Sequence, residues 1–335
     1  MLALAAPLRA WPTSSRHLII SSSCHLVTMA LTVQQLNAIV AHALPDEVLR
    51  EERQRDETCY ELRLGSGERV QVLAFTTVEE ASTAAAALRL LAGEFDLPIP
   101  QLRATDELGA TVGTPYLLVS GAEGEPLPGV QARISGDEQY AIGQRLGELA
   151  SRVHRIAAPQ FGPLNGAGET NERAYMLARL ERAIASVAQH GLLNNAAAGK
   201  LRDFFTQFQP VERPAALVHG GLAPAHLLVR RVGEEWKLAA LLGWQHAIGW
   251  APAWEHAVWW ENSDPTRDFA LRVGYGNSYD QRTQRAYEQV REVALRPYRA
   301  VVLLERIDAS HRAGDSDGAQ RMRSGLFHLI DLLTS

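Results

Sequence analysis

Four histidines fall close together in the chain: His219, His226, His246 and His256. Neutral imidazoles are ligands for zinc and other transition metals, so four converging rings would form a metal site. No cysteine or carboxylate completes a familiar ligand spacing around them, however. We therefore predict no metal site and interpret these histidines as side chains that line a core or a cleft.

Six tryptophans crowd into the same part of the sequence: Trp236, Trp244, Trp250, Trp254, Trp259 and Trp260. An indole ring can fill a core, cover a partner interface, or floor a ligand pocket through stacking and cation–π contact. Trp250, Trp259 and Trp260 are the candidates for the pocket or the interface.

Acidic residues are missing from this part of the chain. Residues 213–233 and 236–254 contain no aspartate or glutamate. Carboxylates serve as general bases and as ligands for Mg²⁺, which prefers hard oxygen donors. The stretch therefore lacks the groups that magnesium-dependent phosphoryl transfer requires.

Hydrophobic periodicity predicts the elements that must position these residues. Thr32 and Gln35 form a capping-box start for a helix that ends at Pro45. Alternating apolar residues predict a hairpin over 60–74, followed by an alanine-rich helix over 78–91 and a strand pair closing at 116–119. Beyond residue 121 the patterns predict mostly helix, at 137–156, 169–189, 196–208 and in several segments of 268–333. One β-like island, at 216–260, interrupts these helices.

Composition excludes several classes of protein. The chain has 335 residues, of which 46% are hydrophobic and 21% charged, so it can build a sizeable core and is not globally disordered. A formal net charge of -5 argues against nucleic-acid or anionic-membrane partners, and no plainly apolar run reaches the length of a membrane span. Its two cysteines, Cys24 and Cys59, cannot form a disulfide framework, so we expect a cytoplasmic protein.

The first 28 residues differ from the rest of the chain. They contain Arg9, Arg16, several serines and no acid, and the first predicted helix begins only after Met29. They read either as an extension ahead of a start at Met29 or as a degenerate targeting peptide, disordered in both cases. We expect three units: this extension at 1–28, an N-terminal lobe at 29–120 and a helical C-terminal lobe at 121–335.

The histidine-bearing stretch resembles two motifs of the aminoglycoside phosphotransferase and choline kinase-like family. Residues 217–229 read LVHGGLAPAHLLV where the family has approximately HGDLHPGNILV, and residues 241–255 read LLGWQHAIGWAPAWE where it has approximately IDWExAGxGDPAxD. Residues 115–127, PYLLVSGAEGEPL, look like the hinge between two lobes, with Ser120, Gly121, Ala122 and Glu123 at its centre. The resemblance implies an α+β, bilobal protein-kinase-like fold. Its small N-lobe would hold an antiparallel sheet and a helix, and its larger C-lobe would be mostly helical.

The same resemblance shows where this chain departs from the family. The catalytic-base position is Gly221, the magnesium-binding asparagine is matched by His226, and the metal-binding aspartate by Gly243. In the N-lobe, the phosphate-binding lysine should fall at Leu73 and its glutamate partner at Ala84. At these five positions the chain therefore lacks the catalytic, metal-binding and phosphate-binding side chains of the family.

Other positions keep structural roles in this resemblance. His219 matches a histidine that braces the catalytic loop, Glu255 matches a structural acid, and Trp244 and Trp254 match core aromatics. The region of the expected glycine-rich loop, 53–58, contains no glycine.

These departures lead to the hypothesis of a pseudokinase, a binding or regulatory module without phosphotransfer. The first alternative is a small-molecule kinase acting on an alcohol group with relocated catalytic residues, and only then are ATP and magnesium expected. A second alternative is a non-kinase enzyme that reuses the cleft histidines. We expect an unknown small molecule in the interlobe cleft, or a protein partner. The candidate ligand-binding side chains are His219, His226, Trp244, His246 and Trp250.

Overall fold

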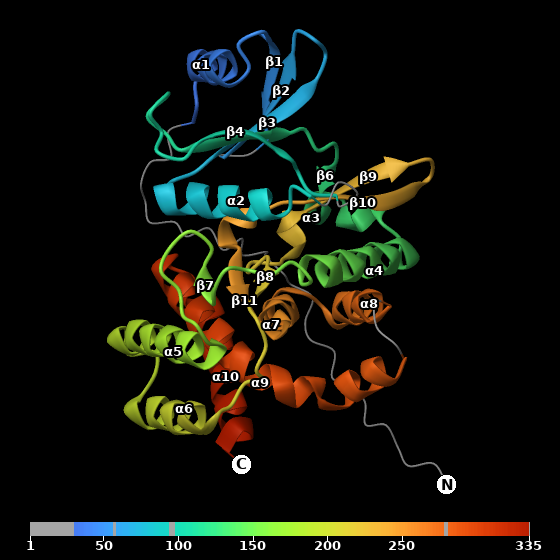
Figure 1. Cartoon of the computed structure of the whole chain (residues 1–335). Helices are drawn as coiled ribbons and strands as arrows, with labels where there is room; N and C mark the ends of the chain where they lie inside the picture. Colours follow the sequence, from blue (N-terminus) through green and yellow to red (C-terminus); the bar gives the residue numbers. More distant parts are fainter. Residues whose placement is uncertain (1–29, 56–57, 94–97, 278–280, 335) are drawn as a thin grey trace.

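The computed structural model describes residues 30–55, 58–93, 98–277 and 281–334, with side chains described outside 281–290. The predicted disordered extension at 1–28 lies outside these residues. The chain folds into two lobes stacked on one another (Figure 1). We call the residues up to Ser120 the N-lobe and those after it the C-lobe.

The N-lobe is built on a five-stranded antiparallel sheet in the order β1-β2-β3-β5-β4. Its elements are α1 (Val33–Ala43), β1 (Leu49–Gln54), β2 (Cys59–Leu64), β3 (Arg69–Ala74), α2 (Val78–Leu90), β4 (Leu102–Asp106) and β5 (Tyr116–Ser120). The predicted capping box of α1 is present, since the Thr32 hydroxyl accepts from the Gln35 backbone and the Gln35 side chain accepts from the Thr32 backbone. The predicted hairpins and the alanine-rich helix are confirmed.

The sheet separates two different environments. Side chains alternate across the strands, so Leu62, Val70 and Leu118 pack with α1 in one apolar cluster. The opposite face turns toward α2 and the C-lobe, and its β1-β2-β3 portion carries charged and amide side chains. This second face forms the roof of a cleft.

The C-lobe is mostly helical. Its helices are α3 (Leu127–Val130), α4 (Gly136–Val153), α5 (Glu172–Gln189), α6 (Asn195–Gln207), α7 (Pro252–Asn262), α8 (Pro265–Gly276), α9 (Gln281–Arg312) and α10 (Ser316–Thr334), with short 3-10 turns η1 (Gln131–Arg133), η2 (Pro224–His226) and η3 (Trp244–His246). Its strands are β6 (Glu125–Pro126), β7 (Gly162–Pro163), β8 (Ala216–Val218), β9 (Leu227–Val232), β10 (Glu235–Leu241) and β11 (Ile248–Trp250). The strands form two small sheets, β10-β9-β6 and β7-β11-β8, which hold the loops that face the cleft.

One apolar cluster runs through both lobes. It joins α2 and β5 of the N-lobe to α4, Trp244 and Trp259 of the C-lobe. The backbone amide of Leu241 also donates to the carbonyl of Pro98 across the lobes, at 2.9 Å. The lobes are therefore packed against each other on the side of α2, whereas an open cavity lies on the side of the hinge.

The predicted β-like island at 216–260 is wrong in its last fifth. The strands end at Trp250, and Pro252–Asn262 forms α7. Proline is well suited to the first turn of a helix because its missing N–H would have no intrahelical partner there. The apolar residues after it belong to a helix that is buried along most of its length.

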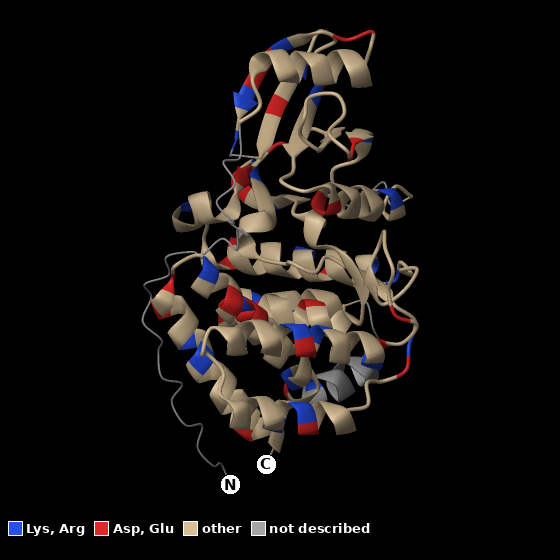
Figure 2. Cartoon of the chain, turned by 90° about the vertical axis from the view of Figure 1, so that its left-hand side faces the viewer, with Lys and Arg blue, Asp and Glu red and all other residues tan. Residues whose placement is uncertain are grey.

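Charged side chains of both signs are interspersed over both lobes (Figure 2). Among the described residues, none of the helices is both long and apolar enough to span a membrane.

Candidate functional site

Two loops meet at the floor of the cleft. The first, residues 219–226, connects β8 to β9, and the second, residues 242–247, connects β10 to β11. Nε2 of His219 donates to the carbonyl of Leu242 at 2.6 Å, which ties the first loop to the second. The two loops therefore form one unit.

Glu255 on α7 holds the first loop from below. Its Oε2 accepts from the backbone amides of His219, at 2.5 Å, and Gly220, at 3.3 Å. Burial raises the pKa of Glu255, but hydrogen bonding and the nearby His154 and His219 outweigh that effect and leave the pKa below its ordinary value. A carboxylate engaged with these backbone amides is a structural brace.

Gly221 faces the ring of His246. A Cβ built at Gly221 would lie 2.8 Å from Cδ2 and 3.0 Å from Cγ of His246. Such contacts are shorter than carbon atoms tolerate, so the imidazole already occupies the space that a side chain at 221 would need. A carboxylate side chain at 221 would require the His246 ring to move.

The same arrangement occurs a second time with the loops exchanged: Gly243 of the second loop faces the ring of His226 of the first loop. The Cβ of any residue at 243 would lie 2.7–2.8 Å from the His226 ring, and Gly243 has φ +88°, which only glycine adopts readily. Nδ1 of His226 donates to the carbonyl of Gly221 at 2.7 Å, which fixes the ring in place. Each of the two glycines is thus covered by a histidine of the other loop.

The imidazoles in this unit are uncharged at neutral pH. Burial is the main cause that lowers the pKa of His219, His226 and His246 to about 4. The ring centroids of neighbouring histidines are 5.6 Å and 5.8 Å apart. His256 does not join them, because it packs on Tyr275 at 4.6 Å.

Metal binding finds little support in these loops. In the part of the chain that the structure describes, no group of three or more His, Cys, Asp or Glu side chains is arranged to hold an ion. The floor of the cleft presents neutral rings where a divalent cation would need oxygen ligands. The residues present therefore do not fit a magnesium-bound nucleotide.

The expectation that Trp250 lines the cleft is wrong. Its side chain is fully buried in the C-lobe, stacked on Trp254 with centroids 4.4 Å apart, and its Nε1 donates to Glu172. The guanidinium of Arg179 lies 5.1 Å from the Trp250 ring and covers it. Side chains alternate between the two faces of β11, so the Trp250 indole points away from the loops and into the helical core.

Other tryptophans also belong to the interior. Trp244 is buried in the cluster shared by the lobes, and its Nε1 donates to the carbonyl of Leu241. Trp259 is buried in the same cluster. Trp260 is only partly buried, and the guanidinium carbons of Arg291 and Arg299 lie 4.7 and 4.6 Å from its ring. The aromatic crowding in the sequence therefore reflects core packing.

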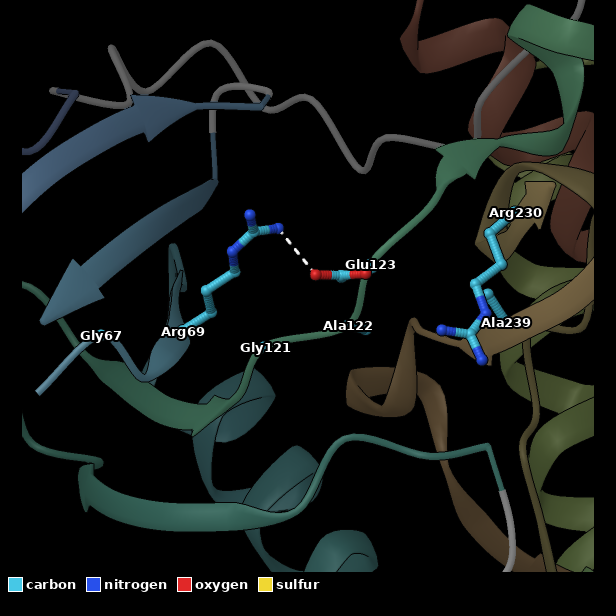
Figure 3. A pocket seen from close by; sticks show the side chains of 7 residues that line it. All are labelled: Gly67, Arg69, Gly121, Ala122, Glu123, Arg230 and Ala239. Carbon is cyan, nitrogen blue, oxygen red and sulfur yellow. Dashed lines mark hydrogen bonds and ion pairs between the residues drawn. The ribbon is translucent and has the colours of Figure 1, made fainter. Parts of the chain in front are cut away.

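A cavity of about 720 Å³ lies under the β1-β2-β3 side of the sheet, next to the hinge. Three of the predicted hinge residues, Gly121, Ala122 and Glu123, line it, whereas the Ser120 hydroxyl accepts from the amide of Gln101. Figure 3 shows a second pocket, which shares the hinge residues, Arg69 and Arg230 with this cavity; Arg230 of the C-lobe lies there opposite the Arg69–Glu123 ion pair. A cavity of this size can hold a small molecule.

Two N-lobe side chains already hydrogen-bond to the hinge. Nε2 of Gln71 donates to the carbonyl of Ala122 at 3.3 Å, and Nη2 of Arg55 donates to the carbonyl of Gly124 at 3.0 Å. Sequence reasoning did not single out Gln71, and it considered Arg55 only as part of the expected phosphate-binding loop. Strand alternation could have found Gln71, because it stands on the same face as Leu73, one period earlier.

The two N-lobe positions singled out in the sequence serve packing. Leu73 packs against the cluster shared by the lobes, and Ala84 is buried in that cluster on α2. The β3 residues that line the cavity are Arg69, Val70 and Gln71, and Leu73 is not among them. The β3 side chain that contacts the hinge is therefore the amide of Gln71.

A family model matches most of the chain. Residues 42–293 match the family described as the phosphotransferase enzyme family. The comparison with curated proteins gives no match.

Solved aminoglycoside phosphotransferases share the fold. The apo form of a thermostable mutant of aminoglycoside phosphotransferase APH(4)-Ia is similar at 16% identity, with a TM-score of 0.62, over 88% of this chain and 98% of that chain. Its D198A form in a ternary complex with ADP and hygromycin B gives 17% identity and a TM-score of 0.60, over 89% and 98%. The GDP complex of aminoglycoside 2'-phosphotransferase-IIIa gives 15% identity and a TM-score of 0.61, over 91% and 99%. At these identities the likeness shows the protein-kinase-like fold.

Proposed function

Because the chain belongs to the phosphotransferase enzyme family, we propose that it is a pseudokinase of this family, a binding or regulatory module that does not transfer phosphoryl groups. The proposal includes a cytoplasmic location and a division into an N-lobe at 29–120 and a C-lobe at 121–335. The cleft of the fold remains its binding site, now for a small molecule other than magnesium nucleotide.

The pairing of each loop glycine with a histidine carries the proposal. Phosphoryl transfer depends on a base or positioning group for the acceptor and on metal ions that neutralise charge on the phosphates. Here His246 fills the space beside Gly221, and His226 fills the space beside Gly243. Neutral rings in both places remove the largest electrostatic contributions to the reaction.

The alternative of relocated catalytic acids is weakened by the role of Glu255. Its Oε2 is engaged by the amides of His219 and Gly220, beneath the loop and away from an acceptor in the cleft. Glu234 lies in the turn between β9 and β10, outside both loops. Neither acid is placed to replace a missing one at Gly221 or Gly243.

The test is a magnesium–ATP turnover assay on the purified full chain. Hygromycin B and other hydroxyl acceptors are offered, because related structures hold nucleotide and hygromycin B together. We expect no turnover above background and no rise in melting temperature with magnesium–ATP. The Glu255→Ala variant is the control for contaminating kinases, because it removes the brace of the first loop. Turnover by the native chain that disappears in this variant would refute the proposal.

A further inference from the structure

The roof of the hinge cavity carries an ordered row of polar side chains. In the register of the sheet, Arg53 of β1 stands opposite Glu61 of β2, and Glu61 stands opposite Gln71 of β3. Directly paired residues project from the same face, with neighbouring Cβ atoms about 5 Å apart. All three line the cavity. A positive, a negative and an amide group therefore follow one another across the roof.

Two buried polar atoms on this roof have no partner among the described residues. Gln71 is 1% exposed, and its Oε1 accepts no hydrogen bond. The amide orientation is fixed, because a flip would place Oε1 against the carbonyl oxygen of Ala122. Nη1 of Arg55 is also buried without a partner, while Nη2 of the same guanidinium contacts Glu61 and Gly124. A buried acceptor and a buried cationic donor left open in one cavity favour a ligand that offers both a donor and an anion.

The charges of the cavity lining match such a ligand. Five arginines line it, namely Arg53, Arg55, Arg63, Arg69 and Arg230, together with five glutamates, namely Glu51, Glu52, Glu61, Glu123 and Glu125. Arg55 is paired with Glu61, Arg69 with Glu123 and Arg63 with Glu51, whereas Arg53, Arg230 and Glu52 have no ion pair with any residue that the structure describes. The lining is therefore balanced overall, and its side chains without an ion pair are two arginines and one glutamate.

A purine base does not suit this cavity. A planar aromatic base needs an apolar slot and hydrogen-bonding groups that are free to receive it. The roof here is charged, and Gln71 and Arg55 already donate to the hinge carbonyls of Ala122 and Gly124. A base would have to displace these contacts and desolvate Glu61.

We propose that the hinge cavity binds a small zwitterion of the α-amino-acid type. Its ammonium group donates to Gln71 Oε1 beside Glu61, and its carboxylate is held by the guanidinium groups of Arg55 and Arg53. This inference rests on the proposed function, since it names the ligand class of a cleft that no longer takes magnesium nucleotide. The two charges of an α-amino acid lie a few bonds apart. Arg55 contacts Glu61, the direct neighbour of Gln71, so its guanidinium is the nearer carboxylate partner, and Arg53 lies one strand farther from Gln71.

The experiment measures binding of the proteinogenic L-α-amino acids to the full chain by thermal shift, followed by calorimetry on those that stabilise it. The corresponding amines without the carboxylate, the acids without the amine, adenosine and ADP are measured alongside. At least one amino acid should raise the melting temperature, and its affinity should exceed that of each single-charge analogue by about tenfold or more.

Variants place the binding in the cavity. Gln71→Leu removes the acceptor at nearly constant size, and Arg53→Met removes a rim charge; each should weaken binding by about tenfold. The control Arg103→Met removes an exposed arginine that pairs with Glu68 outside the cavity, and should leave the affinity unchanged.

Three outcomes overturn the inference: no amino acid binds, binding is indifferent to Gln71→Leu and Arg53→Met, or adenosine or ADP binds more tightly than every amino acid. The first two outcomes leave the proposed function standing when magnesium–ATP turnover is absent. Turnover refutes the proposed function whatever the result with amino acids.

Discussion

Alanine at Gly243 tests the interlock between the two loops. The substitution should destabilise the fold for two separable reasons. A non-glycine residue at φ +88° incurs a left-handed penalty of about 1–2 kcal/mol. Its Cβ would also lie 2.7–2.8 Å from the His226 ring, and overpacking of this kind costs about 1–3 kcal/mol. We expect the free energy of unfolding to fall by about 2–5 kcal/mol in total.

Two companion variants separate these contributions. Gly67 has φ +90°, and no heavy atom would lie within 4 Å of a Cβ at this position, so Gly67→Ala should show the left-handed penalty alone, about 1–2 kcal/mol. In a His226→Ala background the overlap at 243 disappears, and Gly243→Ala should then cost about as much as Gly67→Ala. The coupling energy between positions 226 and 243 should accordingly be about 1–3 kcal/mol.

Urea unfolding of the four chains in the cycle, followed by far-UV circular dichroism, gives these free energies. The reasoning fails if Gly243→Ala costs no more than Gly67→Ala, or if its cost is the same with and without the His226 ring. Either result would mean that the imidazole does not occupy the place of a side chain at 243.

Three further predictions concern the same structure. The pKa of His219, His226 and His246 is about 4 in the fold, against about 6.5 when unfolded, so the unfolded chain takes up protons first as the pH falls. Stability should therefore decline between about pH 6.5 and pH 4, by about 1 kcal/mol for each ring at pH 5.5, and urea unfolding of His226→Asn should show a shallower decline than the native chain. Trp250→Ala should lower the free energy of unfolding by about 3–5 kcal/mol, because the ring is fully buried; a variant that unfolds like the native chain would place Trp250 at a surface. Glu255→Gln should cost about 1–3 kcal/mol and speed hydrogen exchange at the amides of His219 and Gly220, while unchanged exchange would deny the bracing role of the carboxylate.

Local patterns in the sequence were sufficient for most elements of the fold. The Thr32–Gln35 box predicts the start of α1, and the alternation on either side of the turn at 65–67 predicts β2 and β3, because these signals depend on neighbours in the chain. The resemblance to a kinase-like family predicts the bilobal arrangement. The helix α7 was missed since its tryptophans and alanines lack a polar face from which a helical period could be read.

The details of the cleft depended on contacts between distant residues. Nothing in a single sequence indicates that Gly221 faces His246 or that Gly243 faces His226, because each pair is separated by a strand hairpin. For this reason the sequence alone does not show that histidine rings fill the space beside both glycines. The side chains on the hinge cavity, Gln71 and Arg55, likewise depend on which strand face turns toward the C-lobe.

The apolar cluster shared by α2, β5, α4 and Trp244 has a consequence for how the molecule unfolds. Separating the lobes would expose this cluster, and each 100 Å² of apolar surface exposed costs roughly 2.5 kcal/mol. We therefore expect no separate melting transition for the N-lobe sheet, because its unfolding would expose the C-lobe side chains of this cluster to water. Heating should produce one cooperative transition in which the calorimetric and van't Hoff enthalpies agree.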